Sequence, residues 1–342
     1  MERNSEFCPD ISIVTGTYNE EATIHSKIEN MMEMTYPHSK VEWIIIDDCS
    51  KDQTPKIIEE FLPNSNIEMN VRFFQKEERK GLNDTLNRGY ALATGDIVIK
   101  SDCDLVVAPD AVERLVECFQ DGRIGAVTGN VKIANEMAVE KGFKGIENLL
   151  RMAESNLDST YIFEPLSAFR RNLLEQIDER SIADDGEMAL KIRKKGYRTI
   201  YCPKAVFYEE TPTSFRERRR QKDRRAQGHI RLLLQQKGIA FRPKYGKFGL
   251  IIFPANFFMM VISPWWLLLI LGVGTMILFD VLGFVALVLL PLSVMVYFVL
   301  YKIGGPFRFP AAFLDAQLSL LIATFRLVLM REKVVLYKTE RE

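Results

Sequence analysis

Two carboxylates one residue apart are the most chemically informative feature of this sequence. Asp102 and Asp104 directly follow a strand expected over residues 96–100. Carboxylates at a strand exit can point the same way and hold a hard divalent cation against the phosphates of a nucleotide. An Asp-x-Asp triplet by itself also fits a solvated turn at the end of a strand. Its meaning therefore depends on the other motifs of the chain.

Three further clusters of acidic or polar residues accompany this pair. Val14–Glu21 and Ile44–Asp52 begin in apolar, strand-like runs, and Ala183–Glu187 lies downstream. An open α/β sheet displays such clusters at the carboxyl ends of its strands, where ligands bind. The motifs therefore predict one ligand site at the edge of a sheet.

Apolar runs of strand length alternate with stretches of helical period, which implies a largely parallel sheet with crossover helices. The strands are expected over 11–15, 41–46, 71–75, 96–100, 127–133 and 199–201, and the helices over 21–34, 54–61, 82–93, 109–119 and 187–195.

Composition limits the possible functions. Lys plus Arg and Asp plus Glu are 45 each, so the net charge gives no support for nucleic acid as a partner. The five cysteines lack metal-ligand spacing and are expected to be reduced thiols. The polar start of the chain predicts no signal peptide, so we expect the catalytic part to face the cytosol.

The composition becomes strongly apolar after about residue 247. The runs 248–279 and 281–301 are each long enough to cross a bilayer, which takes about 20 helical residues, although a buried core helix is the alternative. The segment 311–330 carries a polar stripe and is expected at the interface or against the bundle. Basic residues flank these segments on the side expected to be cytosolic.

We therefore expect a cytosolic domain over 1–235 and a membrane domain over 236–342 in a multi-pass protein of the cell membrane. The transmembrane helices are expected at about 250–278 and 281–301, and an amphipathic or third membrane helix at about 311–331.

The order and spacing of the motifs resemble those of the family 2 glycosyltransferases, from about Pro9 to the C-terminus. The resemblance implies an inverting transferase with an α/β GT-A fold, that is, a Rossmann-like nucleotide-sugar-binding domain with a mixed, mostly parallel sheet. C-terminal transmembrane or interfacial helices follow this domain in the membrane-bound branch.

The resemblance also implies a donor site for a UDP-sugar. Asp48 is expected on the uridine, and Asp104, with Asp102, on a Mg²⁺ or Mn²⁺ ion that bridges the diphosphate. A capping role for Thr17 or Asn19 at the following helix is an alternative or additional interpretation, and Lys80 could be an ordinary exposed lysine. The nucleotide-sugar-binding residues expected in this half of the chain are Thr15, Thr17, Asn19, Glu20, Asp48, Lys80, Asp102 and Asp104.

Asp185 matches the general base of the family. A carboxylate within hydrogen-bond reach can take the proton of a sugar hydroxyl as its oxygen attacks the anomeric carbon from the face opposite UDP. One base and one displacement imply inversion. The alternative is that Asp184 and Asp185 only begin the following helix. A dedicated base favours a hydroxyl acceptor over a polyprenyl phosphate, which is already ionised at neutral pH.

The basic run 216–225 fits a diphosphate clamp, a contact with anionic lipid or a nucleic-acid tract. Gln221, Arg224 and Arg225 resemble the Gln-x-x-Arg-Trp motif, which implies that Arg224 meets the diphosphate. Arg225 stands where the family has tryptophan, which argues against a processive polysaccharide synthase. No recognition motif accompanies the charge, so we expect no nucleic-acid partner.

Glu164 stands where the family usually has glycine, in a segment that resembles its acceptor side. We expect it to face the acceptor or to pair with Arg170 or Arg171.

Together these features predict a metal-dependent, membrane-bound transferase that moves a hexose from a UDP-sugar to a lipid or lipid-linked acceptor. The alternatives are a polyprenyl-phosphate hexose synthase, a polysaccharide synthase, a sugar-phosphate nucleotidyltransferase or an inactive scaffold. A nucleotidyltransferase would need a glycine-rich loop after the first strand, where this chain has one glycine, Gly16.

Overall fold

The computed structural model describes residues 7–64, 68–134, 138–210, 214–303 and 308–329. The chain forms two compact units. The first comprises residues 1–135, 148–211 and 243–248, and the second comprises residues 136–147, 212–242 and 249–342. Helix α7 (Phe215–Gln235), which the sequence-based boundary at 235 assigns to the catalytic domain, groups with the second unit.

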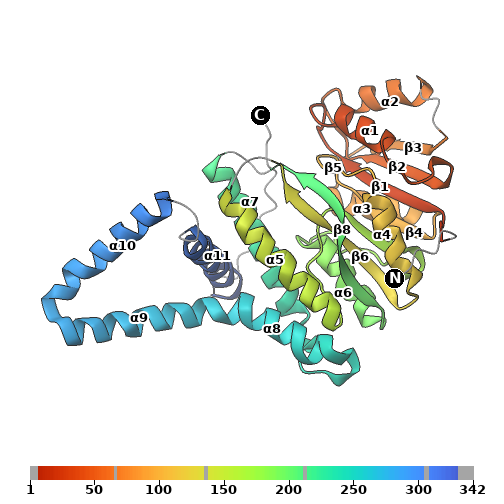
Figure 1. Ribbon diagram of the computed structural model, residues 1–342. Helices are drawn as coiled ribbons and strands as arrows, with labels where there is room; N and C mark the ends of the chain where they lie inside the picture. Colours follow the sequence, from red (N-terminus) through yellow and green to blue (C-terminus); the bar gives the residue numbers. More distant parts are fainter. Residues whose placement is uncertain (1–6, 65–67, 135–137, 211–213, 304–307, 330–342) are drawn as a thin grey trace. The chain divides into compact units, whose positions relative to one another are not determined.

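The first unit is built on a mixed, mostly parallel sheet of eight strands, which confirms the predicted fold class (Figure 1). Strands β3, β2, β1 and β4 run parallel, β7 is antiparallel to β4 and β6, and β5 is antiparallel to β8. The order in the sheet is β3 (Asn70–Gln75), β2 (Val41–Asp47), β1 (Ile11–Thr17), β4 (Ile97–Lys100), β7 (Ser167–Arg170), β6 (Ile124–Ile133), β8 (Arg198–Glu209) and β5 (Val106–Val107).

The chain reverses its direction of progress through the sheet between β1 and β4, because β2 lies on one side of β1 and β4 on the other. Ligands of open α/β sheets bind at such a switch point, outside the carboxyl ends of the strands. The ends of β1, β2 and β4 carry three of the four predicted motifs.

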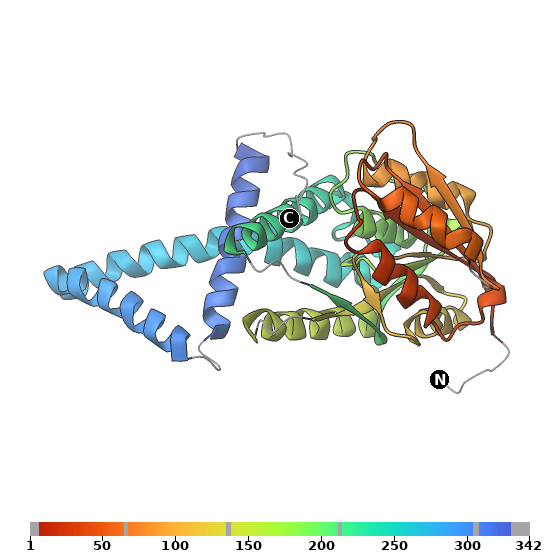
Figure 2. The same cartoon turned by 90° about the horizontal axis from the view of Figure 1, so that it is seen from above.

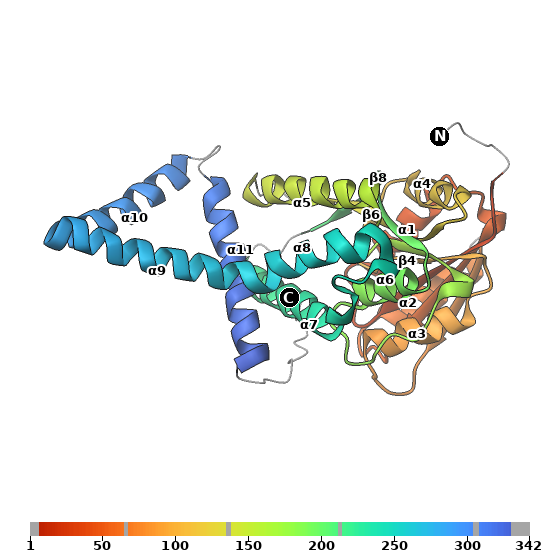
Figure 3. The ribbon, with the colours of Figure 1, turned by 90° about the horizontal axis from the view of Figure 1, so that it is seen from below.

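Alternate residues of the parallel strands feed two separate cores. Ile13 and Ile99 pack on one face with α1 (Ile24–Met32), α2 (Thr54–Asn64) and α4 (Ala111–Glu117). Val14 and Val98 pack on the other face with α3 (Leu82–Leu92) and α6 (Asp184–Lys194). Figure 2 views the first of these faces from above, and α3 and α6 are labelled in Figure 3. Because helices cover both faces of the sheet, the sequences of the central strands are mostly apolar.

Helix α5 (Ala138–Leu157) is not predicted by the sequence. Helices of globular proteins usually bury apolar residues and expose polar ones, and α5 does the opposite. Its buried side carries Arg151 and Ser155, whereas Leu149 is 59% exposed and Leu150 46%. Asn148 on the same helix donates to Asn130 of β6 at 3.0 Å. The apolar side therefore faces away from the sheet.

The second unit contains the apolar part of the chain. Phe248–Leu289 is one helical stretch of 42 residues with a mean hydropathy of 2.4, long and apolar enough by length and composition to cross a membrane. The stretch includes α8 (Phe253–Phe257) and α9 (Ser263–Leu282), with π-helical turns before and after α8.

Helices α10 (Ala286–Ile303) and α11 (Arg308–Thr324) follow. Helix α9 contacts both of them, and α11 also packs against α7. Whether 286–303 and 311–331 enter the membrane stays a prediction, and the basic tail 331–341 lies outside the described residues.

Candidate active site

Four charged groups meet at the carboxyl end of β4. The ammonium of Lys100 lies 2.7 Å from Asp184 Oδ2, 2.9 Å from each oxygen of Asp185 and 3.7 Å from Asp102 Oδ1. Lys100 precedes Asp184 by 84 residues in the chain. Packing of α6 against the sheet therefore brings Asp102 of the Asp-x-Asp pair and the predicted base Asp185 into one cluster around Lys100.

Asp184 and Asp185 occupy the first turn of α6, where the helix dipole favours negative charge. The loop that leads into this turn is held by two asparagines of α3. Asn83 Nδ2 donates to the carbonyls of Asp178 and Ser181 at 2.9 and 2.8 Å. Asn87 exchanges two hydrogen bonds with the Ile177 backbone, at 2.9 and 2.7 Å. The position of Asp185 therefore depends on α3 as well as on α6.

A second buried lysine supports the Asp-x-Asp loop from the opposite face of the sheet. Lys27 of α1 donates to Ser101 Oγ at 2.7 Å and to the Leu105 carbonyl at 3.3 Å. These contacts hold Ser101 and Leu105, which lie on either side of Asp102 and Asp104. Burial lowers the pKa of Lys27 to about 8.

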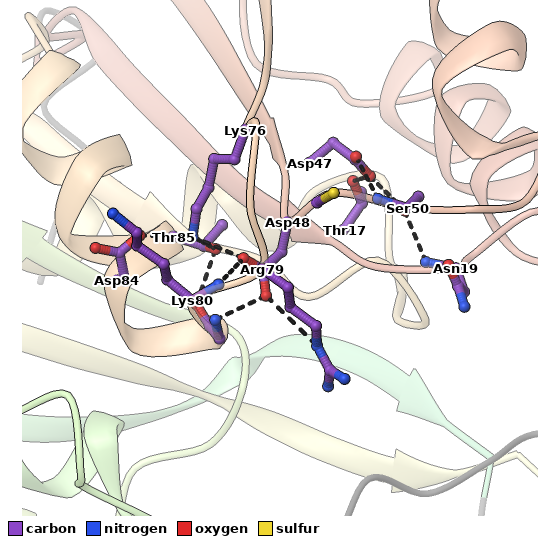
Figure 4. A network of polar contacts seen from close by, with 12 residues as sticks. Thr17, Asn19, Asp47, Asp48, Ser50, Lys76, Arg79, Lys80, Asp84 and Thr85 are labelled. Carbon is purple, nitrogen blue, oxygen red and sulfur yellow. Dashed lines mark hydrogen bonds and ion pairs between the residues drawn. The ribbon is translucent and has the colours of Figure 1, made fainter.

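Asp48 is held by donors from the loop before α3 (Figure 4). Its oxygens accept hydrogen bonds from the amides of Lys80 and Gly81 at 2.9 and 2.8 Å, and Lys76 Nζ lies at 2.7 Å. The side chain of Lys80 points instead to Glu78, 2.9 Å away. The direct contact of Asp48 and Lys80 with a nucleotide stays a prediction, but both clearly shape the loop.

The residues after β1 form a second polar network with the end of β2 (Figure 4). Thr17 Oγ1 donates to Asp47 at 3.0 Å, and Asp47 also accepts from the Ser50 amide at 2.8 Å. The Asn19 amide donates to Ser50 Oγ at 2.8 Å, and Asn19 Oδ1 accepts from the Lys51 amide at 2.9 Å.

Thr15 and Glu20 have partners in the fold as well. Thr15 is fully buried, and its hydroxyl accepts from the indole of Trp43 at 3.0 Å. The Glu20 amide donates to Thr54 at 2.8 Å, and its carboxylate accepts from Thr23 at 2.6 Å. Their contact with a nucleotide also stays a prediction.

The cluster at β4 shifts the ionisation of its members. Burial, and then the charge of Asp184, raise the pKa of Asp185 well above its ordinary value, against the effect of Lys100. Partial burial and the charges of Asp104 and Asp184 raise the pKa of Asp102 to about 6. Burial lowers the pKa of Lys100, but the three carboxylates more than offset it and hold the pKa well above its ordinary value. Lys100 is therefore a cation at neutral pH.

That Asp102 and Asp104 hold a Mg²⁺ or Mn²⁺ ion, with substrate as a further ligand, stays a prediction. Among the residues that the structure describes, no three His, Cys, Asp or Glu side chains form a metal site. Mg²⁺ commonly takes one or two carboxylates and fills its other positions with water and substrate phosphates. Since Asp102 already lies beside Lys100, Asp104 is the better of the two for a direct bond to the ion.

The three predicted residues of the basic run lie on α7 in the second unit. Gln221 is half-buried, and Arg224 and Arg225 are exposed. Their contact with a diphosphate stays a prediction.

Glu164 has a different partner from the one expected. It forms a buried ion pair with Arg151 of α5, and its amide donates to Thr128 Oγ1 at 2.8 Å. Arg170 donates instead to the Ile124 carbonyl at 2.7 Å. The expected pairing with Arg170 or Arg171 is wrong, because α5, which the sequence did not predict, brings Arg151 to this position.

Sequence reasoning missed Lys100, Lys27, Asn83 and Asn87. Lys100 had a visible signal, since a charged residue closes an otherwise apolar strand directly before the acidic pair. The other three lie on helices whose polar positions looked like ordinary solvent-facing ones.

Two family models match the chain. "Glycosyl transferase family 2" covers residues 12–178, and "Glycosyl transferase family group 2" covers residues 97–301. The chain belongs to the family 2 glycosyltransferases. This membership confirms the predicted family.

Curated relatives of this glycosyltransferase include the probable glycosyltransferase YdaM of Bacillus subtilis, 27% identical over 243 residues. The poly-beta-1,6-N-acetyl-D-glucosamine synthase of Staphylococcus aureus is 28% identical over 235 residues. The matches cover 68% and 66% of this chain, but only 58% and 56% of the relatives.

A solved structure similar over most of the chain is the mannosyltransferase PcManGT from Pyrobaculum calidifontis, in complex with GDP-Man and Mn²⁺. It is 26% identical with a TM-score of 0.79, over 96% of this chain and 89% of that one. S. aureus TarS 1–349 in complex with UDP-GlcNAc has a TM-score of 0.52 at 18% identity, over 73% of this chain and 72% of that one. It supports the fold alone.

Proposed function

We propose that this protein is an inverting, metal-dependent glycosyltransferase that moves a hexose from a nucleoside diphosphate sugar to a hydroxyl of a lipid or lipid-linked acceptor at a membrane. The observation that carries the proposal is the cluster at the end of β4, where Asp102 and Asp185 lie around one lysine. An inverting transfer takes place in one displacement step. It requires the residues that bind the sugar donor and the general base to lie at the same site.

In the proposed reaction, Asp185 accepts the proton of the acceptor hydroxyl. The acceptor oxygen forms a bond to the anomeric carbon, and the bond from that carbon to the diphosphate breaks, leaving its electron pair on the phosphate oxygen. A metal ion at Asp104 would neutralise the charge of the departing diphosphate. The ammonium of Lys100, 2.9 Å from both oxygens of Asp185, favours the ionised carboxylate that can accept this proton.

A UDP-sugar is the first candidate donor, from the motif resemblance and from the relative named as an N-acetylglucosamine polymer synthase. GDP-mannose is the second, because the structurally similar mannosyltransferase was solved with it and its match spans nearly the whole chain. The experiment therefore includes both nucleotides.

Membrane association is supported by two independent features. One is the apolar helical stretch Phe248–Leu289. The other is α5, whose exposed side is apolar, a pattern typical of helices at a lipid interface. We propose a membrane protein with its catalytic unit on the cytosolic side, where nucleotide sugars are made, and with the polyprenyl-phosphate and polysaccharide synthases as alternatives.

The test is transfer of label from UDP-sugars and GDP-mannose into extracted membrane lipid by the purified full chain in detergent, with Mn²⁺ or Mg²⁺. Label should enter the lipid phase with wild type and not with Asp185→Asn. Insoluble polymer without lipid label would favour the polysaccharide alternative. Equal transfer by Asp185→Asn would refute the assignment of the base.

A further inference from the structure

Lys100 is an unusual residue for the place it occupies. It ends the apolar strand β4, its side chain is 2% exposed, and it points to the face of the sheet covered by α3 and α6. An ammonium buried to this degree is costly unless charged partners surround it. An apolar residue at position 100 would extend the apolar strand and the core without this cost.

The partners of Lys100 belong to both halves of the proposed reaction. Asp102 comes from the donor motif, and Asp184 and Asp185 come from α6. Three carboxylates this close repel one another in a site with little water. Lys100 supplies the positive charge that lets them lie together.

The contact with Asp185 is the most specific of the three. Both of its oxygens lie 2.9 Å from Nζ, so the ammonium sits on the bisector side of the carboxylate and restricts its rotation. A carboxylate oxygen has two lone pairs. Each oxygen can therefore accept from Lys100 and still accept a proton from an acceptor hydroxyl.

We propose that Lys100 is a positioning residue for the general base, fixing the orientation of the Asp185 carboxylate and its distance from the donor motif. The proposal rests on the proposed function, in which Asp185 is the base. Lys100 itself gives and takes no proton in the reaction. Because Lys100 also contacts Asp102, it fixes the position of Asp185 relative to the donor-binding residues.

The decisive variant is Lys100→Met, which keeps an unbranched side chain, one heavy atom shorter, and removes the charge. Since a well-placed base contributes about 10²- to 10⁴-fold, we expect kcat to fall by about 100-fold or more. The affinity for UDP and GDP, measured by calorimetry with Mn²⁺, should not weaken, because Asp104 and the Asp48 loop remain. Lys100→Arg, which keeps a cation, should retain more activity than Lys100→Met.

A double variant separates positioning from a general structural effect. Lys100→Met combined with Asp185→Asn should be no slower than Asp185→Asn alone, because Lys100 acts through Asp185. Losses that multiply would overturn the proposal, as would wild-type kcat in folded Lys100→Met or a loss of nucleotide affinity that accounts for the fall in rate. Lys40→Met is the matched control, because Lys40 pairs with Asp10 at 3.0 Å on the surface of the same unit.

If Lys100→Met does not fold, Lys100→Met with Asp184→Asn carries the test, because it removes one positive and one negative charge together. We expect this protein to fold and to be slow, and a wild-type rate would overturn the proposal. Failure of the proposed function is distinguishable: wild-type turnover by Asp185→Asn refutes the base itself. An inactive Asp185→Asn with a fully active Lys100→Met refutes only the role of Lys100.

Discussion

Two of the aspartates at the strand ends of the first unit are held by hydrogen bonds from neighbouring loops. Asp48 is bound by two amides and Lys76, and Asp47 by Thr17 and Ser50. Such carboxylates organise loops. Asp104 lies in the loop after β4 and is half-buried, and we expect it to bind an ion that arrives with the substrate.

At this scale, Asp104→Asn should weaken Mn²⁺-dependent binding of UDP or GDP by about 10- to 100-fold, a range typical of changes at metal sites. The neutral amide is a poorer ligand for a hard cation, and the fold should be unaffected. Calorimetry with and without Mn²⁺ measures the effect. Asp10→Asn, at an exposed position, is the control, and unchanged Mn²⁺ dependence in Asp104→Asn would contradict the assignment.

Helix α3 is the element that links the donor loop to the base. Its start is fixed by the Asp48 contacts, and its asparagines hold the loop before α6. Asn83→Asp is isosteric but turns a donor toward three carbonyls into an acceptor. The unmade hydrogen bonds should cost about 1–3 kcal/mol.

We therefore expect Asn83→Asp to lower the melting temperature and to reduce kcat by about tenfold, with nucleotide affinity retained. The matched control is Asn70→Asp, at an exposed strand end. Thermal unfolding and turnover, measured on the same preparations, check the expectation. A variant with lower stability and unchanged kcat would show that the loop does not position the base.

Glu42 lies near the start of β2, at the end of the strand opposite the site. Its hydrogen bonds with Ser12, Arg72 and Thr94 stabilise this end of the sheet. Burial alone would raise the pKa of Glu42, but hydrogen bonds from Ser12, Thr94 and Arg72 more than offset it, so the pKa lies below its ordinary value. A carboxyl with a depressed folded-state pKa stabilises the fold above its unfolded pKa and loses this contribution as the pH falls.

Glu42→Gln should accordingly lower the free energy of unfolding by about 1–3 kcal/mol at pH 7. The difference from wild type should shrink below about pH 4, where the unfolded glutamate becomes protonated. Urea unfolding across this pH range measures it. A difference that stays constant from pH 7 to pH 3 would contradict the argument.

For the whole molecule, the proposed membrane association can be tested at α5. The exposed apolar side of α5 carries Ile146, Leu149, Leu150 and Leu157. In the proposed arrangement this side lies in the lipid interface. A tryptophan introduced as Leu149→Trp should then be quenched by brominated lipid in nanodiscs, beyond the signal of the native tryptophans.

Lys56→Trp, on the exposed side of α2, is the control and should show no added quenching. Equal behaviour of the two variants would remove α5 from the membrane interface. The apolar stretch Phe248–Leu289 would then be the only described support for membrane association.

Local patterns in the sequence predicted most of the fold. The apolar runs predicted β1, β2, β3 and β4 to within two residues at each end, because strands covered on both faces are mostly apolar. Strands β5 and β7 were missed, since two and four residues are too few to show a period. Helix α5 was missed because its apolar side is the exposed one.

What the sequence alone determined was the family, the sheet type and the four motifs at the strand ends and at the start of α6, because each is written in consecutive residues. Only the tertiary structure decided which side chains meet: Lys100 with Asp185, Asn83 with the loop before α6, and Arg151 with Glu164. Such contacts are set by strand order and by the packing of helices on the sheet. Neither the strand order nor the helix packing can be recognised from a periodic pattern around the residues that come into contact.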